Sequence, residues 1–371
     1  MTRKQFSRSV LATLVILALA NVAVAVPWYT VTDITPGGFR DLNNNEQVCG
    51  SYPTDYGATF WEDGVVTDLG ILPGYDCTVA EGISPSGQYL AGYAYDEATY
   101  PDAAMAVLWA DGVMIEPDLL PGHLYGTAYD ANDSGIAAGW SSAAAYSSNQ
   151  LLPVYWDSTG AVHALPLPDG AGFGSAMDIN NAGQIVGEIC LSDHAEAAIW
   201  NGGTPEGMGV LPGYRNSWSR AINESGQAAV NSARNEDGTH YEQAALWDAG
   251  VLTALGSLPG YRNTRSFGIN EARHIVGAAF NERESTGIDT HAFIWIDGQI
   301  LDLNWLIPGY SGWELTMARS INDSGQIVAK GFYDGEGRSV LLTPMPIPAP
   351  GAVLLGIFGV GVVGVIRWRK R

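Results

Sequence analysis

One tryptophan recurs at nearly even intervals along most of this chain. Each copy ends a short apolar run and is followed within four residues by a turn glycine, and consecutive copies lie 48, 47, 44, 47 and 48 residues apart. A period this even indicates a repeat architecture, in which every unit builds the same supersecondary structure. The six copies are Trp61, Trp109, Trp156, Trp200, Trp247 and Trp295.

Each unit contains four short β-rich segments separated by turn signals. The segment that ends at the Trp is often followed by Asp-Gly, as at Asp63-Gly64, which suits a tight hairpin because glycine tolerates positive φ. The next segment runs to Leu-Pro-Gly-Tyr, as at 211–214, the pattern of a type II turn. The third leads into Ile-Asn-x-x-Gly, as at 222–226, where the Asn side chain caps its own turn. A short fourth segment of small residues follows, such as 184–187.

Four strands in 44–48 residues is the period of a β-propeller blade, so the sequence predicts an all-β propeller. A helical repeat of this length would need two or three segments of 3.6-residue periodicity, whereas this chain has 46 glycines and short apolar runs. A β-helix would need shorter and more regular rungs. We expect each repeated Trp to be a core anchor that packs against the next blade, with stacking on a sugar ring as the alternative.

The two ends of the repeat array are incomplete in a complementary way. The segment 29–34 resembles the strand that follows the Asp-Gly turn, so the array starts without the strand before it. The segment 339–343 is an extra strand beyond the last full unit. A ring closed by strands from both ends leaves no open sheet edge. Six full units and one shared unit therefore predict seven four-stranded blades, and an open array of β-units is the alternative.

The N-terminal segment has the composition of a targeting signal. Residues 1–25 combine a basic start, an apolar run and the small-residue sequence Ala23-Val24-Ala25. This pattern predicts a secretory signal peptide that is cleaved between Ala25 and Val26, with an N-terminal membrane anchor as the alternative.

The C-terminal segment, residues 346–371, has the composition of a membrane tether. An apolar run at 351–366 precedes the basic tail 367–371. We expect a short transmembrane segment whose basic end stays in the cytoplasm. The propeller domain would then span residues 26–345.

The body between these ends is strongly acidic. The terminal segments hold seven of the 18 Lys and Arg residues and none of the 39 Asp and Glu residues, which leaves 11 basic against 39 acidic residues and a net charge of −28. Nucleic acid and anionic membrane surfaces are therefore poor partners, and the acidity fits a solvated surface, cation binding or a basic partner. Cys49, Cys77 and Cys190 lack zinc spacing, and export permits a disulfide between the first two, although sequence cannot fix the pairing.

The tripeptide His291-Ala292-Phe293, followed by Ile294-Trp295 and later by Ile-Asn-Asp-Ser-Gly-Gln-Ile-Val at 321–328, resembles the HAF-repeat family of bacterial extracellular proteins. The resemblance covers roughly residues 28–345, although only one unit keeps the full HAF spelling. It implies secretion and a repeat fold but no established activity, so no catalytic residue carries over to this chain.

The C-terminal segment is similar to the PEP-CTERM sorting signal, which consists of a Pro-Glu-Pro-like motif, an apolar helix and an Arg-rich tail. Here the motif reads Pro348-Ala349-Pro350, with Ala in place of Glu. The resemblance implies processing near this motif by an exosortase-type membrane enzyme in a Gram-negative envelope. It also implies an association with bacteria that produce exopolysaccharide or form biofilms.

The sequence contains no local catalytic or cofactor motif in the sequence context that its function requires. Residues 359–364 match G-x-G-x-x-G but lie in the apolar tail, and the six histidines form no zinc motif. Asp41-x-Asn43-x-Asn45 resembles the start of a calcium loop, but Glu46 occupies the place of the sharp-turn glycine, so we expect an ordinary polar turn.

Two departures from the repeat are weak candidates for a local function. His123 replaces the Tyr of Leu-Pro-Gly-Tyr in its unit, and Arg273 replaces the glycine of the Ile-Asn turn. No residue is predicted to be catalytic, to bind a cofactor or to bind a metal.

The sequence therefore predicts a secreted or cell-surface protein that acts as a non-catalytic binding or structural module, with a polysaccharide or a protein as its ligand. Signal peptidase and an exosortase-type enzyme would process it. One alternative is a carbohydrate-active propeller enzyme, whose Asp, Glu or His side chains would have to converge from several blades. Another is a calcium-stabilised matrix protein.

Overall fold

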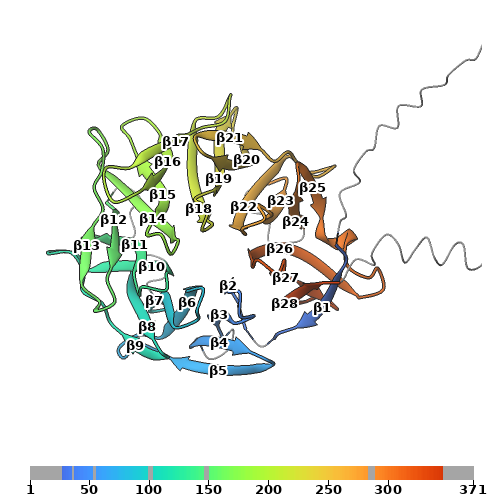
Figure 1. Ribbon diagram of the computed structural model, residues 1–371, viewed down its shortest axis with the longest axis horizontal. Coiled ribbons are helices and arrows are strands. Elements are labelled where there is room, and N and C mark those ends of the chain that lie inside the picture. Colours follow the sequence, from blue (N-terminus) through green and yellow to red (C-terminus); the bar gives the residue numbers. More distant parts are fainter. Residues whose placement is uncertain are drawn as a thin grey trace, which may run out of the picture.

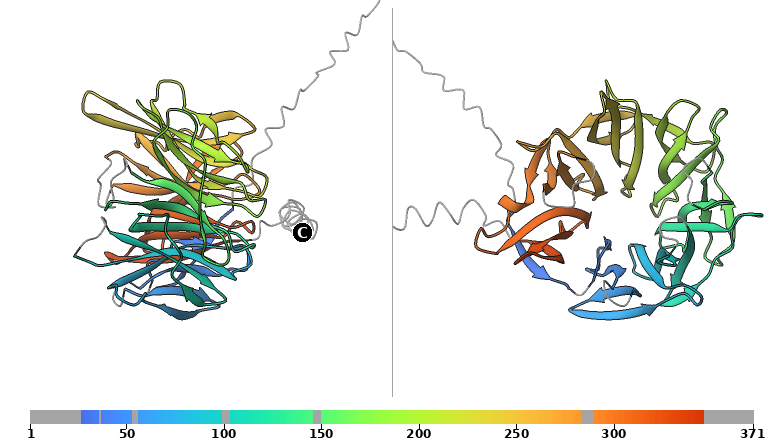
Figure 2. Two further views of the ribbon diagram at one scale, coloured as in Figure 1. Left: turned by 90° about the vertical axis from the view of Figure 1, so that its left-hand side faces the viewer. Right: turned by 180° about the vertical axis from the view of Figure 1, so that it is seen from behind.

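The strands form a ring of seven four-stranded antiparallel sheets, a seven-bladed β-propeller (Figure 1). The computed structural model describes residues 27–345 apart from Pro36 and the segments 53–55, 99–102, 146–149 and 283–288. Seen from the side, the ring is a thick disc (Figure 2). The predicted fold class, including the number of blades, is confirmed.

Each blade is described here from its innermost to its outermost strand. Blades 1 to 4 are β2 (Asp41–Leu42), β3 (Val48–Ser51), β4 (Ala58–Glu62) and β5 (Val65–Gly70); β6 (Cys77–Ile83), β7 (Tyr89–Tyr95), β8 (Ala104–Ala110) and β9 (Val113–Ile115); β10 (Tyr125–Ala131), β11 (Ala137–Ser142), β12 (Leu152–Trp156) and β13 (Val162–Ala164); and β14 (Phe173–Ile179), β15 (Ile185–Cys190), β16 (Ala195–Trp200) and β17 (Glu206–Gly209). Blades 5 to 7 are β18 (Asn216–Ile222), β19 (Ala228–Glu236), β20 (Thr239–Asp248) and β21 (Val251–Ala254); β22 (Asn263–Ile269), β23 (Ile275–Phe280), β24 (Thr290–Ile296) and β25 (Gln299–Asp302); and β26 (Trp313–Ile321), β27 (Ile327–Tyr333), β28 (Glu336–Pro344) and β1 (Tyr29–Asp33). A short 3₁₀ helix, η1 (Leu303–Trp305), links blades 6 and 7.

The ring is closed by pairing the two ends of the array within blade 7. Strand β1 lies antiparallel to β28, with Val31 opposite Leu342, and so forms the outermost strand of a blade whose other three strands come from the C-terminal end. This arrangement confirms the shared blade that the incomplete ends of the array predict. Closure removes the open edges that a sheet array would otherwise expose.

The repeat unit and the blade differ in phase. The Trp strand, with which the sequence unit begins, is the third strand of its blade, and the strand that leads into the Ile-Asn turn is the innermost. Blade 7 follows the same register without a Trp, since Leu342 lies opposite Ile327, as Trp200 lies opposite Ile185 in blade 4.

The turns adopt the geometries that their residues favour. Asp63 and Gly64 both have positive φ (49° and 82°), as in a type I′ hairpin turn. In Leu-Pro-Gly-Tyr at 211–214, Gly213 has φ 85° and the Tyr214 N–H donates to the Leu211 carbonyl at 3.0 Å, which is a type II turn. These turns set where each strand begins and ends, and therefore the number of residues in each blade.

The repeated Trp side chains lie in the apolar layers between blades, and all six are at most 8 % exposed. Trp247 of blade 5, for example, shares a core cluster with Val186 and Ile199 of blade 4. The contact is therefore with the preceding blade, not with the next blade as expected from the sequence. Because these side chains are enclosed, stacking on a sugar ring is not available to them.

Several sequence predictions concern residues outside the described part of the chain. These are the signal peptide with its cleavage site at Ala23, Ala25 and Val26, and the C-terminal sorting segment with Pro348, Ala349 and Pro350. Within the described residues, no helix is long and apolar enough to cross a membrane.

The closure predicts a large effect of one side chain in β1. Tyr29 is 1 % exposed and packs into the core between blades 6 and 7. Tyr29→Ala should lower the free energy of unfolding by about 3–5 kcal/mol, because it leaves a cavity where the ring closes. Urea denaturation would measure this, with Thr32→Ala on the exposed face of the same strand as the control. Equal stability of the two variants would contradict the closure.

Candidate functional site

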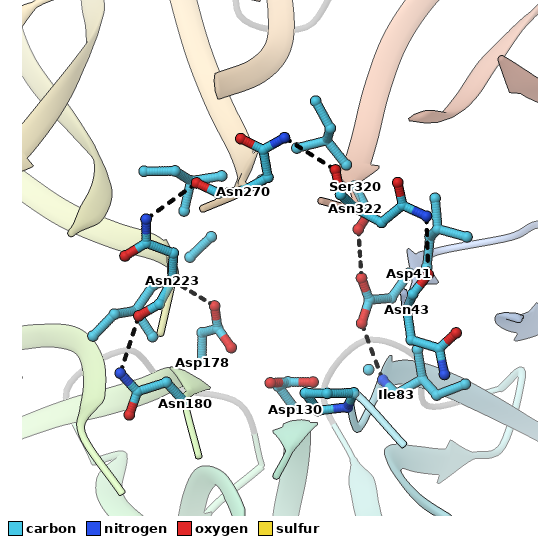
Figure 3. A pocket seen from close by; sticks show the side chains of 18 of the residues that line it. Asp41, Asn43, Ile83, Asp130, Asp178, Asn180, Asn223, Asn270, Ser320 and Asn322 are labelled. Carbon is cyan, nitrogen blue, oxygen red and sulfur yellow. Dashed lines mark hydrogen bonds between the residues drawn. The ribbon is translucent and has the colours of Figure 1, made fainter. Parts of the chain in front are cut away.

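A cavity of about 390 Å³ opens on the axis of the ring. Its walls come from the innermost strands of all seven blades and from the Ile-Asn turns that follow them. The lining is predominantly polar, and Figure 3 shows side chains from several blades pointing into the space. We call this space the central pocket.

The Asn of each Ile-Asn turn holds the mouth of the pocket together. Asn223 accepts a hydrogen bond from the Gln227 N–H at 2.8 Å and so caps its own turn. Its Nδ2 donates to the Asn270 carbonyl of the next blade at 3.1 Å (Figure 3). The same Nδ2-to-carbonyl bond, at 3.0–3.3 Å, joins six of the seven neighbouring blade pairs, through Asn43, Asn132, Asn180, Asn223, Asn270 and Asn322.

Blade 2 has Ser84 at the position of this Asn. Ser84 still provides the carbonyl that Asn43 reaches, at 3.3 Å. The link from blade 2 to blade 3 is made one layer further out, where the Ser86 N–H donates to Asp133 Oδ1 at 2.7 Å. The ring of hydrogen bonds therefore continues across the one blade that lacks the Asn.

A second, more exposed layer surrounds the mouth. At this layer a side chain of six blades, all except blade 2, accepts the backbone N–H of the preceding blade, as when Glu271 N–H donates to Asp323 Oδ1 at 2.9 Å. Four of the acceptors are acidic and give the mouth a negative charge: Asp133, Glu224, Glu271 and Asp323. We call this layer the acidic rim.

Below the Asn ring, a β-bulge turns two successive side chains towards the axis. In six of the innermost strands the register with the neighbouring strand shifts at the residue three positions before the turn Asn (or Ser84 in blade 2). A bulge adds one residue on one strand and re-aims the side chains around it. As a result, two adjacent positions of each strand line the pocket.

The position two residues before the turn Asn places three aspartates on the wall. Asp41 accepts hydrogen bonds from Ser320 Oγ at 2.6 Å and from the Ile83 N–H at 3.0 Å. Asp178 accepts the Ile222 N–H of blade 5 at 2.7 Å. Both carboxylates therefore also link neighbouring blades through hydrogen bonds.

Asp130 differs from these two aspartates, because its buried Oδ1 has no hydrogen-bond partner among the described residues. It lies against the inner strand of blade 2, where a side chain at Gly82 would collide with its carboxyl group. Asp130 also hydrogen-bonds to Asp178. Two carboxyl groups in hydrogen-bond contact share a proton, since two carboxylate charges so close together are strongly unfavourable.

The three wall carboxyl groups hold protons more strongly than free aspartates. Burial raises the pKa of Asp41 to about 6. Burial and the Asp178 carboxylate raise the pKa of Asp130 well above its usual value. Burial also raises the pKa of Asp178, although hydrogen bonds from Asp130 and the Ile222 N–H oppose the rise. Of the two carboxyl groups, Asp130 therefore holds the shared proton more strongly.

The floor of the pocket is formed by the residues three positions before the turn Asn. Three of them are cationic, namely Arg40, Arg220 and Arg319, and Glu81 is the acidic member. Arg40 lies 3.5 Å from Glu81. The central pocket thus has an acidic rim, an aspartate wall and a largely basic floor.

The residues singled out from the sequence fall partly in this pocket. Asp41 and Asn43 line it, but Asn43 Oδ1 accepts the N–H groups of Asn45 and Gln47, so the calcium-like motif forms a capped polar turn. The described residues contain no cluster of three or more His, Cys, Asp or Glu side chains arranged to bind a metal.

The other candidates lie outside the pocket lining. His123 contacts Ser141 Oγ through Nδ1 at 2.9 Å. Arg273 keeps the turn despite its side chain, with φ 62° in place of the glycine. Cys49, Cys77 and Cys190 are free thiols. Asp130, Asp178 and the floor arginines, in contrast, were not singled out from the sequence, although each stands at a fixed offset before a turn Asn.

Comparisons with known proteins support the fold only. No protein-family model and no curated protein matches the chain. Among solved structures, YCF48 bound to a D1 peptide is similar with a TM-score of 0.53 and 12 % identity, over 87 % of this chain and 99 % of that one. A chain of the mitotic checkpoint complex is similar with a TM-score of 0.50 and 12 % identity, over 92 % and 99 %.

The Asn ring predicts a stability effect for a single amide. Asn223→Ala removes the turn cap and the bond to blade 6, and leaves buried backbone groups without partners. The free energy of unfolding should fall by about 2–3 kcal/mol. Asn201→Ala, in an exposed turn, is the matched control and should be close to neutral. If urea denaturation gave similar values for both variants, the ring would not hold the blades.

The raised pKa values predict a loss of stability with rising pH. Asp41, Asp130 and Asp178 keep protons in the folded chain that the unfolded chain releases near pH 4. Their contribution is fully present below that pH and is lost as the pH rises through about 6 and above. Asp130→Asn removes one of these groups but keeps a donor to Asp178. The loss between pH 4 and pH 7 should shrink by on the order of 1 kcal/mol.

Urea denaturation at several pH values would measure this difference. The exposed Asp169→Asn variant is the control and should follow the unmodified chain. A pH profile of Asp130→Asn that is parallel to that of the control would show that the carboxyl pair does not hold the extra proton.

Proposed function

We propose that this protein is an exported binding module that takes its ligand in the central pocket. The observation that carries the proposal is the convergence of polar side chains from all seven innermost strands on one cavity of about 390 Å³. A concave site with a few convergent polar groups is the usual form of a ligand site, and this volume lies within the usual range. The fold supplies the site, because only a closed ring brings these strands together.

Polysaccharide is the ligand class that the lining favours. Carboxyl and amide groups of the wall and mouth are donors and acceptors suited to hydroxyl groups, and the floor adds guanidinium donors. A protein ligand is the alternative within the same proposal. The similar YCF48 structure contains a bound peptide, which is consistent with a binding role for a ring of this kind.

We propose the cell surface or the extracellular matrix as the location. The support is the sequence of the two terminal segments, with signal peptidase acting between Ala25 and Val26 and an exosortase-type enzyme acting near Pro348-Ala349-Pro350. Before this processing the apolar run would tether the protein transiently in the inner membrane of a Gram-negative envelope. Mass spectrometry of the secreted protein would show whether the mature chain starts at Val26.

A second function has one specific observation in its favour. A carbohydrate-active enzyme requires acidic groups that converge from several blades, and Asp130 and Asp178 do converge. Their direct hydrogen bond, however, is shorter than the separation of roughly 5–9.5 Å between the two carboxyl groups of most glycosidases. Asp178 also has a structural role as the acceptor of the Ile222 N–H. These features favour binding over hydrolysis.

The proposal predicts that filling the pocket abolishes binding. The mature chain, residues 26–345, would be screened against glycan arrays and matrix extracts. Ala221, on the wall of blade 5, lines the pocket, and Ala221→Phe should weaken binding of any captured glycan at least about tenfold by excluding it. Ala254→Phe on the exposed outermost strand β21 should have no effect.

The same samples distinguish the two functions. Release of reducing sugar from a captured glycan, abolished in Asp130→Asn, would establish the enzyme. Binding that survives Ala221→Phe would move the ligand site away from the central pocket and contradict the proposal.

A further inference from the structure

Two of the floor arginines have a hydrogen-bond donor for which the described residues provide no acceptor. The Nε–H groups of Arg220 and Arg319 are buried and have no hydrogen-bond acceptor among the described residues. A buried donor without an acceptor is unfavourable, and one on a charged group more so. Native proteins rarely keep such groups unless something else supplies the acceptor.

The positive charge of the floor is only partly balanced locally, by Glu81 beside Arg40 and by Glu188, which interacts with Arg220. The Arg319 guanidinium lies 5.4 Å from the centre of the Phe267 ring, and its burial together with the charges of Arg40 and Arg220 lowers its pKa to about 10. Burial and the charges of Arg40 and Arg319 likewise lower the pKa of Lys330, on strand β27 of blade 7, to about 7. The Glu81 carboxylate favours the charged form of both groups. An anion at the floor would offset this excess of positive charge.

The wall above the floor offers hydrogen-bond acceptors. Asp130 and Asp178 converge on the pocket wall (Figure 3) and share one proton, and Asp130 Oδ1 accepts no hydrogen bond from the described residues. Because the shared proton lies between the two carboxyl groups, their remaining oxygen lone pairs can accept hydrogen bonds from hydroxyl groups. The pocket therefore has groups that can bind hydroxyls on its wall and cationic side chains at its floor.

We propose that the central pocket binds one anionic sugar residue, with its carboxylate or sulfate on Arg220 and Arg319 and its hydroxyl groups on Asp130 and Asp178. The inference rests on the proposed function and names the class of its ligand. Guanidinium groups form charge-assisted hydrogen bonds with planar carboxylates and with sulfate oxygens alike. The acidic rim restricts the ligand further, since Glu224, Glu271 and Asp323 repel a polyanion, so the sugar chain carries isolated rather than successive acidic residues.

Calorimetric titration of the purified full-length chain in mild detergent would test this inference. The probes are glucuronate, glucose 6-sulfate, glucose and glucosamine. At least one of the two anionic sugars should bind about tenfold or more tightly than glucose, and the tighter of the two identifies the source of the anion. Arg319→Gln should weaken that binding about ten- to a hundredfold, since it removes a charge-assisted bond.

A second floor variant and a surface variant serve as controls. Arg220→Gln should weaken binding to a similar extent, so the test does not depend on a single substitution. Thermal melting would confirm that each variant folds. Arg262→Gln, on an exposed turn, should bind as the unmodified chain does.

Three outcomes would overturn the inference. These are tighter binding of glucosamine, equal or absent binding of all four sugars, and anionic sugar binding that both folded floor variants retain. If a neutral matrix glycan binds and Ala221→Phe abolishes that binding, the proposed function is supported. Only the inference that the ligand is anionic is then wrong.

Discussion

The amide of the Ile-Asn turn is the interaction on which the rest of this ring depends. Each Asn caps its own turn through Oδ1 and reaches the carbonyl of the following blade through Nδ2, as Asn270 does towards Asn322 at 3.0 Å. The apolar layers and their Trp side chains hold neighbouring blades together without regard to direction. The Asn bonds are directional and fix how far each innermost strand stands from the next. They therefore set the width of the mouth.

A pocket with charged walls follows from that constraint. The innermost strands converge on the axis, where no further sheet covers them, and the bulge in six of them turns two side chains inward. Polar groups brought together in this way lose water and shift their protonation, as the Asp130 and Asp178 pair does. Asp130 Oδ1 and the Nε–H groups of Arg220 and Arg319 have no hydrogen-bond partner among the described residues, and the proposed ligand would supply these partners.

The fold could be predicted from the sequence because it is local and repeated. The Trp period, the Asp-Gly and Leu-Pro-Gly-Tyr turns and the complementary ends were enough to predict seven blades with one shared. The site could not be predicted in the same way, since Asp130 and Asp178 meet only through the curvature of the ring. A weaker signal existed: three of the seven residues two positions before the turn Asn, or before Ser84, are aspartates. Which of them would pair depends on side-chain packing, which no spacing reveals.

The central claim is that the axis of the ring, and not its outer edges, holds the ligand. The most direct measurement is a crystal structure of the protein grown with a bound acidic oligosaccharide. The account predicts one anionic sugar residue on the axis, with its acidic group at Arg319 and its hydroxyl groups at Asp130 and Asp178. A ligand held on the outermost strands, with both arginine Nε–H groups still lacking an acceptor, would contradict it.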